Sequence, residues 1–162
     1  MEIRDLRPGD WQQIWPFFRD ILADGETYAY PEDLTAEQAQ QLWTPGPRAR
    51  TVVAVDGDRV LGVAIAGPNR PGRGEHVATA SFMVSPAARG RGVGRALAEH
   101  VLRWASQAGF RAMQFNAVVE TNTAAVALWE SLGFDTVGIV PEAFDSRAHG
   151  LVGLRVMYRR LE

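Results

Sequence analysis

The stretch from Ser81 to Leu97 constrains the fold most, because it joins a strand pattern to a helix pattern through a glycine-rich turn. Residues 79–84 are apolar and β-prone, and Pro86 ends this pattern because proline cannot donate to a sheet ladder. From Val93 onward, apolar residues recur at helical spacing. The turn Arg89-Gly90-Arg91-Gly92-Val93-Gly94 therefore lies at a helix N-terminus, where free backbone N–H groups and the helix dipole favour an anion. The sequence predicts an anion site here, most naturally for a pyrophosphate.

This turn fits one of three known phosphate-binding patterns. The dinucleotide fingerprint fails because its sixth position, counted from Gly90, is Arg95, and the nucleotide-triphosphate loop fails because the chain lacks Gly-Lys-Ser/Thr. The pattern Arg/Gln-x-x-Gly-x-Gly/Ala fits, with Arg89, Gly92 and Gly94. It resembles the acetyl-CoA loop of the GNAT N-acetyltransferases. On its own the stretch is equally well explained as a glycine-rich turn with surface arginines, so the rest of the chain must decide.

The bulk properties exclude several kinds of protein. The 162 residues predict one domain, spanning 1–162, and 46% hydrophobic with 22% charged residues is typical of a soluble globule. A net charge of −2 gives no general attraction to nucleic acid or to an anionic membrane, so neither is expected as a partner. The absence of cysteine excludes disulfides, thiolate zinc sites and a cysteine nucleophile. We expect a cytoplasmic protein without signal peptide, membrane helix or metal.

The pattern of the whole chain predicts the order β-α-α-β-β-β-α-β-α-β-β. The expected strands cover residues 3–6, 51–55, 60–66, 79–84, 111–119, 136–140 and 152–159. Four helices are expected. The first follows Asp10, with a kink or a late start at Pro16, and the second follows the capping box Thr35-x-x-Gln38. The third runs from Val93 to Gly109, and the fourth runs from Thr121 or Asn122 to Gly133. An antiparallel first half meets a strand-helix-strand crossover, so the fold class is α/β (α+β) with a mixed, mostly antiparallel sheet flanked by helices.

A second segment supports the resemblance. Residues 122–134, Asn-Thr-Ala-Ala-Val-Ala-Leu-Trp-Glu-Ser-Leu-Gly-Phe, are similar to the family's Asn-x-x-Ala-x-x-Leu-Tyr-x-x-x-Gly-Phe helix. With the element order, the resemblance to the GNAT family covers nearly the whole chain. It implies an N-acetyltransferase whose two central strands splay apart at one end, so that acetyl-CoA enters the gap from one side and the amine from the other.

The resemblance also implies where acetyl-CoA lies. Met83 and Val84 would pair their backbone with the pantetheine arm, the turn would hold the pyrophosphate, and Asn122, Ala125 and Trp129 would line the other side. A backbone N–H in the Val84 region could polarise the thioester carbonyl. The full set of expected cofactor contacts is Phe82, Met83, Val84, Arg89, Gly90, Arg91, Gly92, Val93, Gly94, Arg95, Asn122, Ala125 and Trp129.

Trp129 departs from the family pattern. The family often has Tyr at this position, and that phenol commonly protonates the leaving thiolate. An indole N–H is far too weak an acid for this task, although it can donate a hydrogen bond. Trp129 is therefore expected to pack in the core and contact the cofactor, with the thiolate protonated by water or by another group.

The expected catalytic residues are Val84, Asn116 and Glu120. Asn116 interrupts an apolar strand, and a buried amide must be satisfied. It bonds either a neighbouring loop or the substrate in the gap. Glu120 lies just past that strand and is one candidate for the base that deprotonates the amine. Glu75 and His76 precede the 79–84 strand, where the family often has a base, but a solvated loop end explains them as well.

The expected acceptor site involves Glu26, Tyr28, Asn116 and Arg147. The first two lie in a loop that covers the acceptor in this fold, and Arg147 could bind a carboxylate. Short segments around Tyr28, Asn116, Asn122, Trp129 and Met157 resemble a GNAT branch acting on proline analogues and other small amino or imino acids. The sequence thus predicts an acetyltransferase of a small amine. A peptide or protein lysine acetyltransferase and a CoA-binding module without turnover stay as alternatives, and a homodimer is left open.

Overall fold

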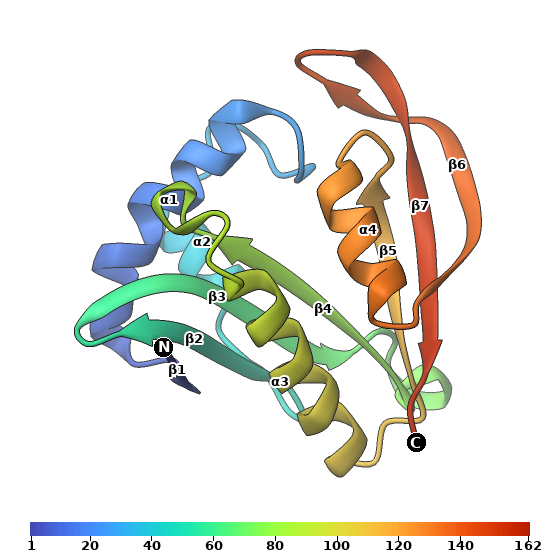
Figure 1. The fold of residues 1–162 in the computed structure, drawn as a ribbon, viewed down its shortest axis with the longest axis horizontal. Helices are drawn as coiled ribbons and strands as arrows, with labels where there is room; N and C mark the ends of the chain where they lie inside the picture. The colour runs from blue at the N-terminus through green and yellow to red at the C-terminus, as the bar shows by residue number, and fades with distance from the viewer.

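One seven-stranded sheet organises the computed structural model, which describes all residues from Met1 to Glu162 (Figure 1). The strand order is β1-β2-β3-β4-β5-β7-β6. Only β4 and β5 are parallel, and all other neighbours are antiparallel, which confirms the predicted mixed sheet. The strands are β1 (Glu2–Asp5), β2 (Arg50–Asp56), β3 (Arg59–Pro68), β4 (Val77–Val84), β5 (Ala112–Val119), β6 (Asp135–Ser146) and β7 (Gly150–Arg160).

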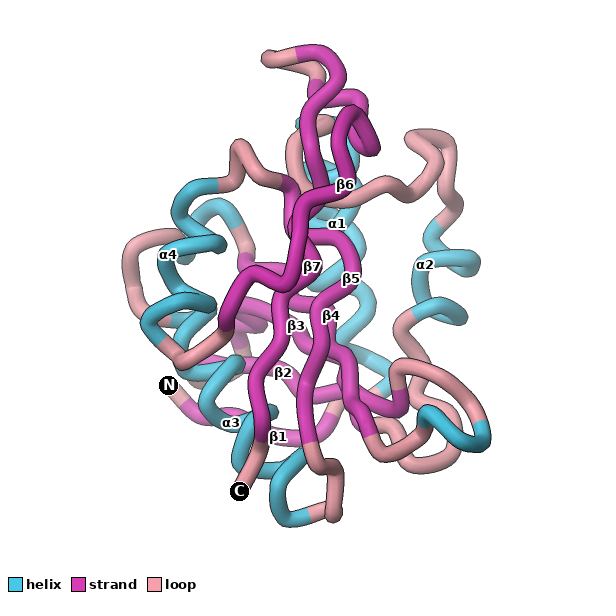
Figure 2. Tube along the Cα trace, turned by 90° about the vertical axis from the view of Figure 1, so that its right-hand side faces the viewer, coloured by secondary structure: helices cyan, strands magenta, loops and turns pink.

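Helices cover both faces of this sheet (Figure 2). They are α1 (Trp11–Asp24), α2 (Ala36–Leu42), α3 (Val93–Gln107) and α4 (Thr123–Ser131). Alternation along β2 divides the core, because Val53 and Val55 pack in the cluster that contains the apolar side of α1, whereas Val52 and Ala54 pack in the cluster that contains α3 and α4. Both faces of the central strands are therefore buried, which explains their nearly continuous apolar sequence. None of the four helices is long and apolar enough to cross a membrane.

The caps and turns that the sequence predicts are present in the structure. The capping box forms as expected, since the Gln38 backbone N–H donates to the Thr35 hydroxyl and the Thr35 N–H donates to the Gln38 side-chain carbonyl. Gly25 ends α1 in the left-handed conformation, with a φ of 69°. Asp56 pairs with Arg59 across the hairpin that joins β2 to β3. The predicted order of strands and helices is confirmed.

The structure differs from the expectations at two places. Of the two alternatives at Pro16, a kink or a late start, the late start does not occur, because the first helix begins at Trp11 and contains Pro16. Residues 141–151 were expected to be a loop, but β6 continues to Ser146 and only residues 147–149 form the turn to β7. Pro141 is tolerated because β6 is an edge strand of the sheet, and the ladder is irregular between Val140 and Phe144.

The parallel pair β4–β5 is the feature that shapes the site. Hydrogen-bonded pairing covers only Val77 with Ala112 and Ala78 with Met113. Beyond these residues β4 stays paired with β3 while β5 stays paired with β7. The two strands therefore diverge, and Figure 1 shows them splaying apart toward the end nearest α4 and the β6–β7 turn. The predicted splay is present.

Candidate functional site

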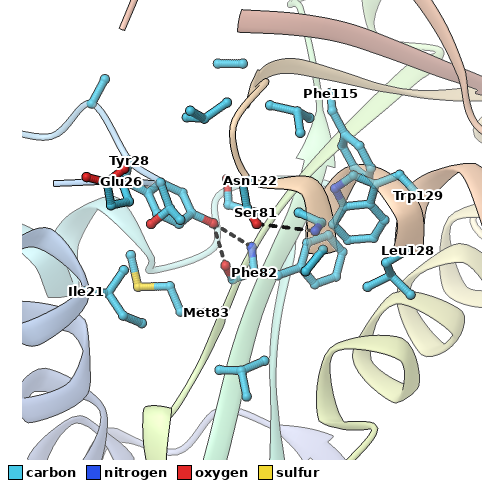
Figure 3. A pocket seen from close by; sticks show the side chains of 18 of the residues that line it. Ile21, Glu26, Tyr28, Ser81, Phe82, Met83, Phe115, Asn122, Leu128 and Trp129 are labelled. Atoms are coloured by element: carbon cyan, nitrogen blue, oxygen red, sulfur yellow. Dashed lines mark hydrogen bonds between the residues drawn. The ribbon is translucent and has the colours of Figure 1, made fainter. Parts of the chain in front are cut away.

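A cleft of about 1120 Å³ opens where β4 and β5 separate. Its walls come from β4, β5, the loop after α1, and α4, with contributions from the turn after β4 (Figure 3). Phe82 lies near its middle, with Tyr28 and Glu26 on one side and Trp129 and Leu128 on the other. The cleft is thus an opening between two halves of the molecule, with β4 as its floor.

The turn after β4 has the backbone conformation that its glycines allow. Gly90 and Gly92 both have a φ of 75°, in the left-handed region that side chains disfavour. Gly92 precedes α3, whose first turn has no side-chain cap, so its N–H groups are free to meet an anion. Arg89 lines the cleft and makes no ion pair or side-chain hydrogen bond. These features suit a ligand with negative charge at this end of the cleft.

Other predicted turn residues contribute differently. Arg91 pairs with Asp56 at 3.2 Å, and Arg95 donates to the Ser131 hydroxyl at 2.7 Å, so both guanidinium groups already have partners. The Val93 side chain is buried and cannot reach a ligand. Only Arg89 and Gly90 of this stretch line the cleft itself, whereas the other predicted contacts, Arg91, Gly92, Val93, Gly94 and Arg95, lie beyond its lining.

An aromatic cluster forms the wall toward α4. The Trp129 ring lies 5.0 Å from the Phe82 ring and 4.6 Å from the Phe115 ring, measured between centroids. Trp129 is buried yet lines the cleft, as does Ala125 one turn earlier. Asn122 caps α4, because its side-chain oxygen accepts the Ala125 backbone N–H at 3.3 Å. Core packing at Trp129, expected from the helical pattern, is what the structure shows.

Asn116 lies in the cleft but is not buried. It sits where the β5–β7 register shifts, between Phe115 and Val118, and this irregularity exposes its side chain. Its amide donates to the Asn69 side-chain oxygen at 2.6 Å and accepts from Gln114 at 2.9 Å. The expectation of a buried amide is wrong, since Asn116 bonds the neighbouring loop and still lines the gap.

Tyr28 reaches from the loop after α1 to the floor of the cleft. Its hydroxyl accepts the Phe82 backbone N–H at 2.9 Å and donates to the Phe82 carbonyl at 2.5 Å (Figure 3). The ring stacks on Tyr30 with centroids 5.6 Å apart, and it meets the edge of Trp43 at 6.4 Å. Burial raises the pKa of the Tyr28 phenol far above its usual value, so the hydroxyl keeps its proton at neutral pH.

Glu26 fastens the same loop to the β6–β7 turn. Its carboxylate accepts from the Ser146 hydroxyl at 2.7 Å and from the Ala148 backbone N–H at 2.8 Å. The Ser146 hydrogen bond, with that of Ala148, lowers the pKa of the Glu26 carboxyl. Glu26 lines the cleft, but its two oxygens are already engaged, which makes it a weak base.

Two predicted site residues lie elsewhere. Arg147 is not part of the cleft lining, because its guanidinium pairs with Glu32 and its backbone N–H donates to Gly25. Glu120 is also absent from the lining, and its carboxylate fills the space above Gly153, where that residue has no side chain. We therefore correct both expectations: neither side chain faces an acceptor in this cleft.

Arg89 is the only basic residue of the lining, whose titratable side chains are Asp24, Glu26, Tyr28, Tyr30 and Arg89.

Some lining residues gave no signal in the sequence. Phe144 and Leu154 reach the cleft from β6 and β7. No local pattern marks such residues, because they meet the site only through the pairing of distant strands.

Comparison with known proteins identifies the family. The model of the acetyltransferase (GNAT) family matches residues 15–134. A GCN5-related N-acetyltransferase from Kribbella flavida is 62% identical, with a TM-score of 0.96 over 99% of this chain and 97% of that one. A phosphinothricin acetyltransferase from Sinorhizobium meliloti, solved in complex with AcCoA, is 28% identical, with a TM-score of 0.86 over 99% of this chain and 88% of that one.

A relative from Schizosaccharomyces pombe supports the same family. The N-acetyltransferase aca1 of Schizosaccharomyces pombe is 31% identical over 140 residues, which are 77% of this chain and 67% of that protein. The family match, the solved structures and the splayed sheet with its glycine turn agree. The chain belongs to the acetyltransferase (GNAT) family and is an N-acetyltransferase.

Proposed function

We propose that this chain transfers the acetyl group of acetyl-CoA to the amine of a small molecule, an amino or imino acid being the favoured class. Both substrates would bind together, and the amine would attack the thioester directly. The observation that carries the proposal is the gap between β4 and β5, which has an anion-binding turn at one end and the Tyr28 loop at the other. Holding two reactants in one cleft supplies much of the rate.

The cofactor half is supported by charge and by the backbone. The free Arg89 guanidinium and the uncapped start of α3 would hold the pyrophosphate. Phe82 and Val84 line the cleft on the edge of β4 that β5 leaves unpaired, where an amide-containing arm could add as a strand. The Sinorhizobium relative, whose complex contains AcCoA, has the same fold over 99% of this chain.

The acceptor half favours a small, cationic or polar molecule. Its titratable groups are acids and phenols, with no basic side chain, which suits an amine. The buried Thr27 hydroxyl has no hydrogen-bond partner and lines the cleft, so it is available to a polar acceptor. With Arg147 paired elsewhere, a carboxylate on the acceptor would rely on hydroxyl and backbone donors of this kind. The loop that Tyr28 and Glu26 fasten covers this half.

The chemistry requires no covalent intermediate on the enzyme. The neutral amine nitrogen would attack the carbonyl carbon, the C–S bond would break, and the nitrogen's proton would pass to solvent. Backbone N–H groups of β4 would stabilise the oxyanion. The Glu120 carboxylate lies outside the cleft lining, and both oxygens of the Glu26 carboxylate already accept hydrogen bonds, so we assign neither residue as the base.

A thiol-release assay with a panel of acceptors tests the proposal. Amino acids, proline analogues, polyamines, aminoglycosides and peptides should be compared at equal concentration. We expect turnover with small amino or imino acids. The chain contains no lysine, so any acetyl-lysine found by mass spectrometry belongs to an added peptide and not to the enzyme. Turnover confined to peptides or polyamines would contradict the acceptor class, and binding of acetyl-CoA without turnover of any amine would leave a binding module.

A further inference from the structure

The open edge of β4 carries backbone groups that need partners. β4 pairs with β3 from Ala78 to Val84, but with β5 only at Val77 and Ala78. Where β5 has moved away, the N–H and C=O of Phe82 point into the cleft, as their hydrogen bonds to Tyr28 demonstrate. An unpaired strand edge of this kind is a template for an added strand or for any ligand with alternating donors and acceptors.

Tyr28 acts as the partner that β5 does not provide. One hydroxyl satisfies both backbone groups of Phe82, accepting from the N–H at 2.9 Å and donating to the carbonyl at 2.5 Å. The phenol comes from a loop, so it is held by stacking on Tyr30 and by the edge of Trp43 instead of by sheet hydrogen bonds. Its contact with β4 can therefore change without breaking a strand pair.

Any ligand that pairs with β4 at this point competes with the phenol. An incoming amide N–H would replace the hydroxyl as donor to the Phe82 carbonyl. An incoming carbonyl oxygen would replace it as acceptor from the Phe82 N–H. The Tyr28 O–H would then have lost its acceptor, and a buried donor without an acceptor is costly. The new carbonyl oxygen, next to the displaced phenol, is the nearest replacement.

We propose that Tyr28 is a catalytic residue that exchanges partners: its hydroxyl leaves Phe82 when acetyl-CoA binds and donates to the thioester carbonyl oxygen beside the Phe82 N–H. This inference rests on the proposed function. The amine nitrogen bonds to the carbonyl carbon, the C–S bond breaks with CoA leaving as the thiolate, and the nitrogen's proton passes to solvent. Tyr28 keeps its proton throughout and serves only as a donor to the oxyanion.

The role proposed for Tyr28 is distinct from that of the family's usual phenol at position 129, which commonly protonates the leaving thiolate. Indole cannot supply the phenol that the family often has at that position. The Trp129 ring packs on the Phe82 side chain at 5.0 Å, whereas Tyr28 bonds the backbone of the same residue. The chain thus has a phenol bonded to the backbone of Phe82, on the side of that residue opposite Trp129 and from another part of the sequence (Figure 3).

The test compares Tyr28→Phe with Tyr158→Phe, since Tyr158 lies outside the cleft lining. In Tyr28→Phe we expect CoA to bind about two- to tenfold more tightly by calorimetry, because no phenol has to be displaced. We expect kcat to fall by about 10²-fold, the usual effect of losing one oxyanion donor. A purely structural role would weaken binding and turnover together. Tyr158→Phe should change neither.

A wild-type measurement covers the case in which the variant does not fold. With ring-labelled tyrosine, the three tyrosines give few NMR signals, and the Tyr28 signal should shift on addition of acetyl-CoA while the Tyr158 signal stays. An unmoved Tyr28 signal, or a folded Tyr28→Phe enzyme with wild-type kcat, overturns the inference. Wild-type protein that binds no acetyl-CoA overturns the proposed function instead, so the two failures are distinguishable.

Discussion

The turn at residues 89–94 and the loop at residues 25–30 border the same cleft but are held by different forces. The turn depends on its own backbone, with two glycines at a φ of 75° leading into an uncapped helix. The loop depends on side chains that cross the molecule, from Tyr28 to Phe82 and from Glu26 to Ser146. A turn built from backbone groups offers the same donors as long as its glycines are kept, whereas a loop held by side chains changes with each of them.

Because of this difference, mutations in the turn and in the loop should affect the binding of different substrates. Damage to the turn should weaken acetyl-CoA binding and leave the acceptor pocket formed. Damage to the loop away from Tyr28, whose hydroxyl is proposed to exchange partners when acetyl-CoA binds, should change acceptor binding and leave the cofactor site formed. The fixed partner, acetyl-CoA, would thus meet donors that come from the backbone, and the variable partner would meet the part of the site that side chains shape.

Gly92→Asp should give the largest effect. The substitution strains a left-handed position and brings a negative charge toward the expected pyrophosphate. Like charges about 4 Å apart repel by roughly 1–4 kcal/mol, so acetyl-CoA affinity measured by calorimetry should fall roughly fivefold to a thousandfold.

Gly72→Asp is the matched control for that variant. Gly72 also has a positive φ, 57°, and a side chain there would meet no atom within 4 Å, as at Gly92. It lies in the connection between β3 and β4, outside the cleft lining. Equal losses of affinity in the two variants would show that backbone strain, not the site, caused the effect.

Trp129→Phe should affect stability more than catalysis. The smaller ring leaves a poorly filled site against Phe82 and Phe115, so the free energy of unfolding should fall by about 1–3 kcal/mol in urea titrations. The kcat should fall by less than about tenfold, because the indole is not the acid. A loss beyond about a hundredfold, with fold and cofactor affinity intact, would mean that Trp129 takes part in the chemistry.

Glu26→Gln should give the smallest effect and confine it to the acceptor. A neutral amide accepts less strongly from Ser146 and Ala148, so the acceptor KM should rise about threefold to tenfold while acetyl-CoA affinity stays unchanged. Glu32→Gln, which removes an exposed ion pair between Arg147 and a residue just beyond that loop, is the control.

The two hydrogen bonds that the Glu26 carboxylate accepts should make the stability of the folded protein depend on pH. Because they lower the pKa of Glu26 in the folded protein, their stabilisation is complete above the ordinary carboxyl pKa and is lost as the pH falls through the lowered value. Below about pH 4.5 the wild-type thermal midpoint should therefore fall more steeply than that of Glu26→Gln. Parallel curves would contradict the role of the carboxylate in holding the loop.

The sequence predicted the local parts of this molecule and missed the distant ones. The turn, the capping box at Thr35 and the helix stripes depend on neighbours within a few residues, so their patterns are visible in the chain. Arg147 and Glu120 were placed by their position in loops, but their side-chain directions follow from Glu32 and Gly153, which sequence spacing does not reveal. The exposure of Asn116 depends on a register shift, and the extent of β6 on its edge position.

Amide hydrogen exchange of the whole chain, with and without acetyl-CoA, tests the central claim most directly. The claim is that the cofactor binds to the backbone of the turn and the start of α3. Acetyl-CoA should slow the exchange of amides 90–95, which lack side-chain caps, and leave amides 106–111 near the second, smaller hollow unchanged. Protection of 106–111 without protection of 90–95, or no protection at all at saturating acetyl-CoA, would contradict it.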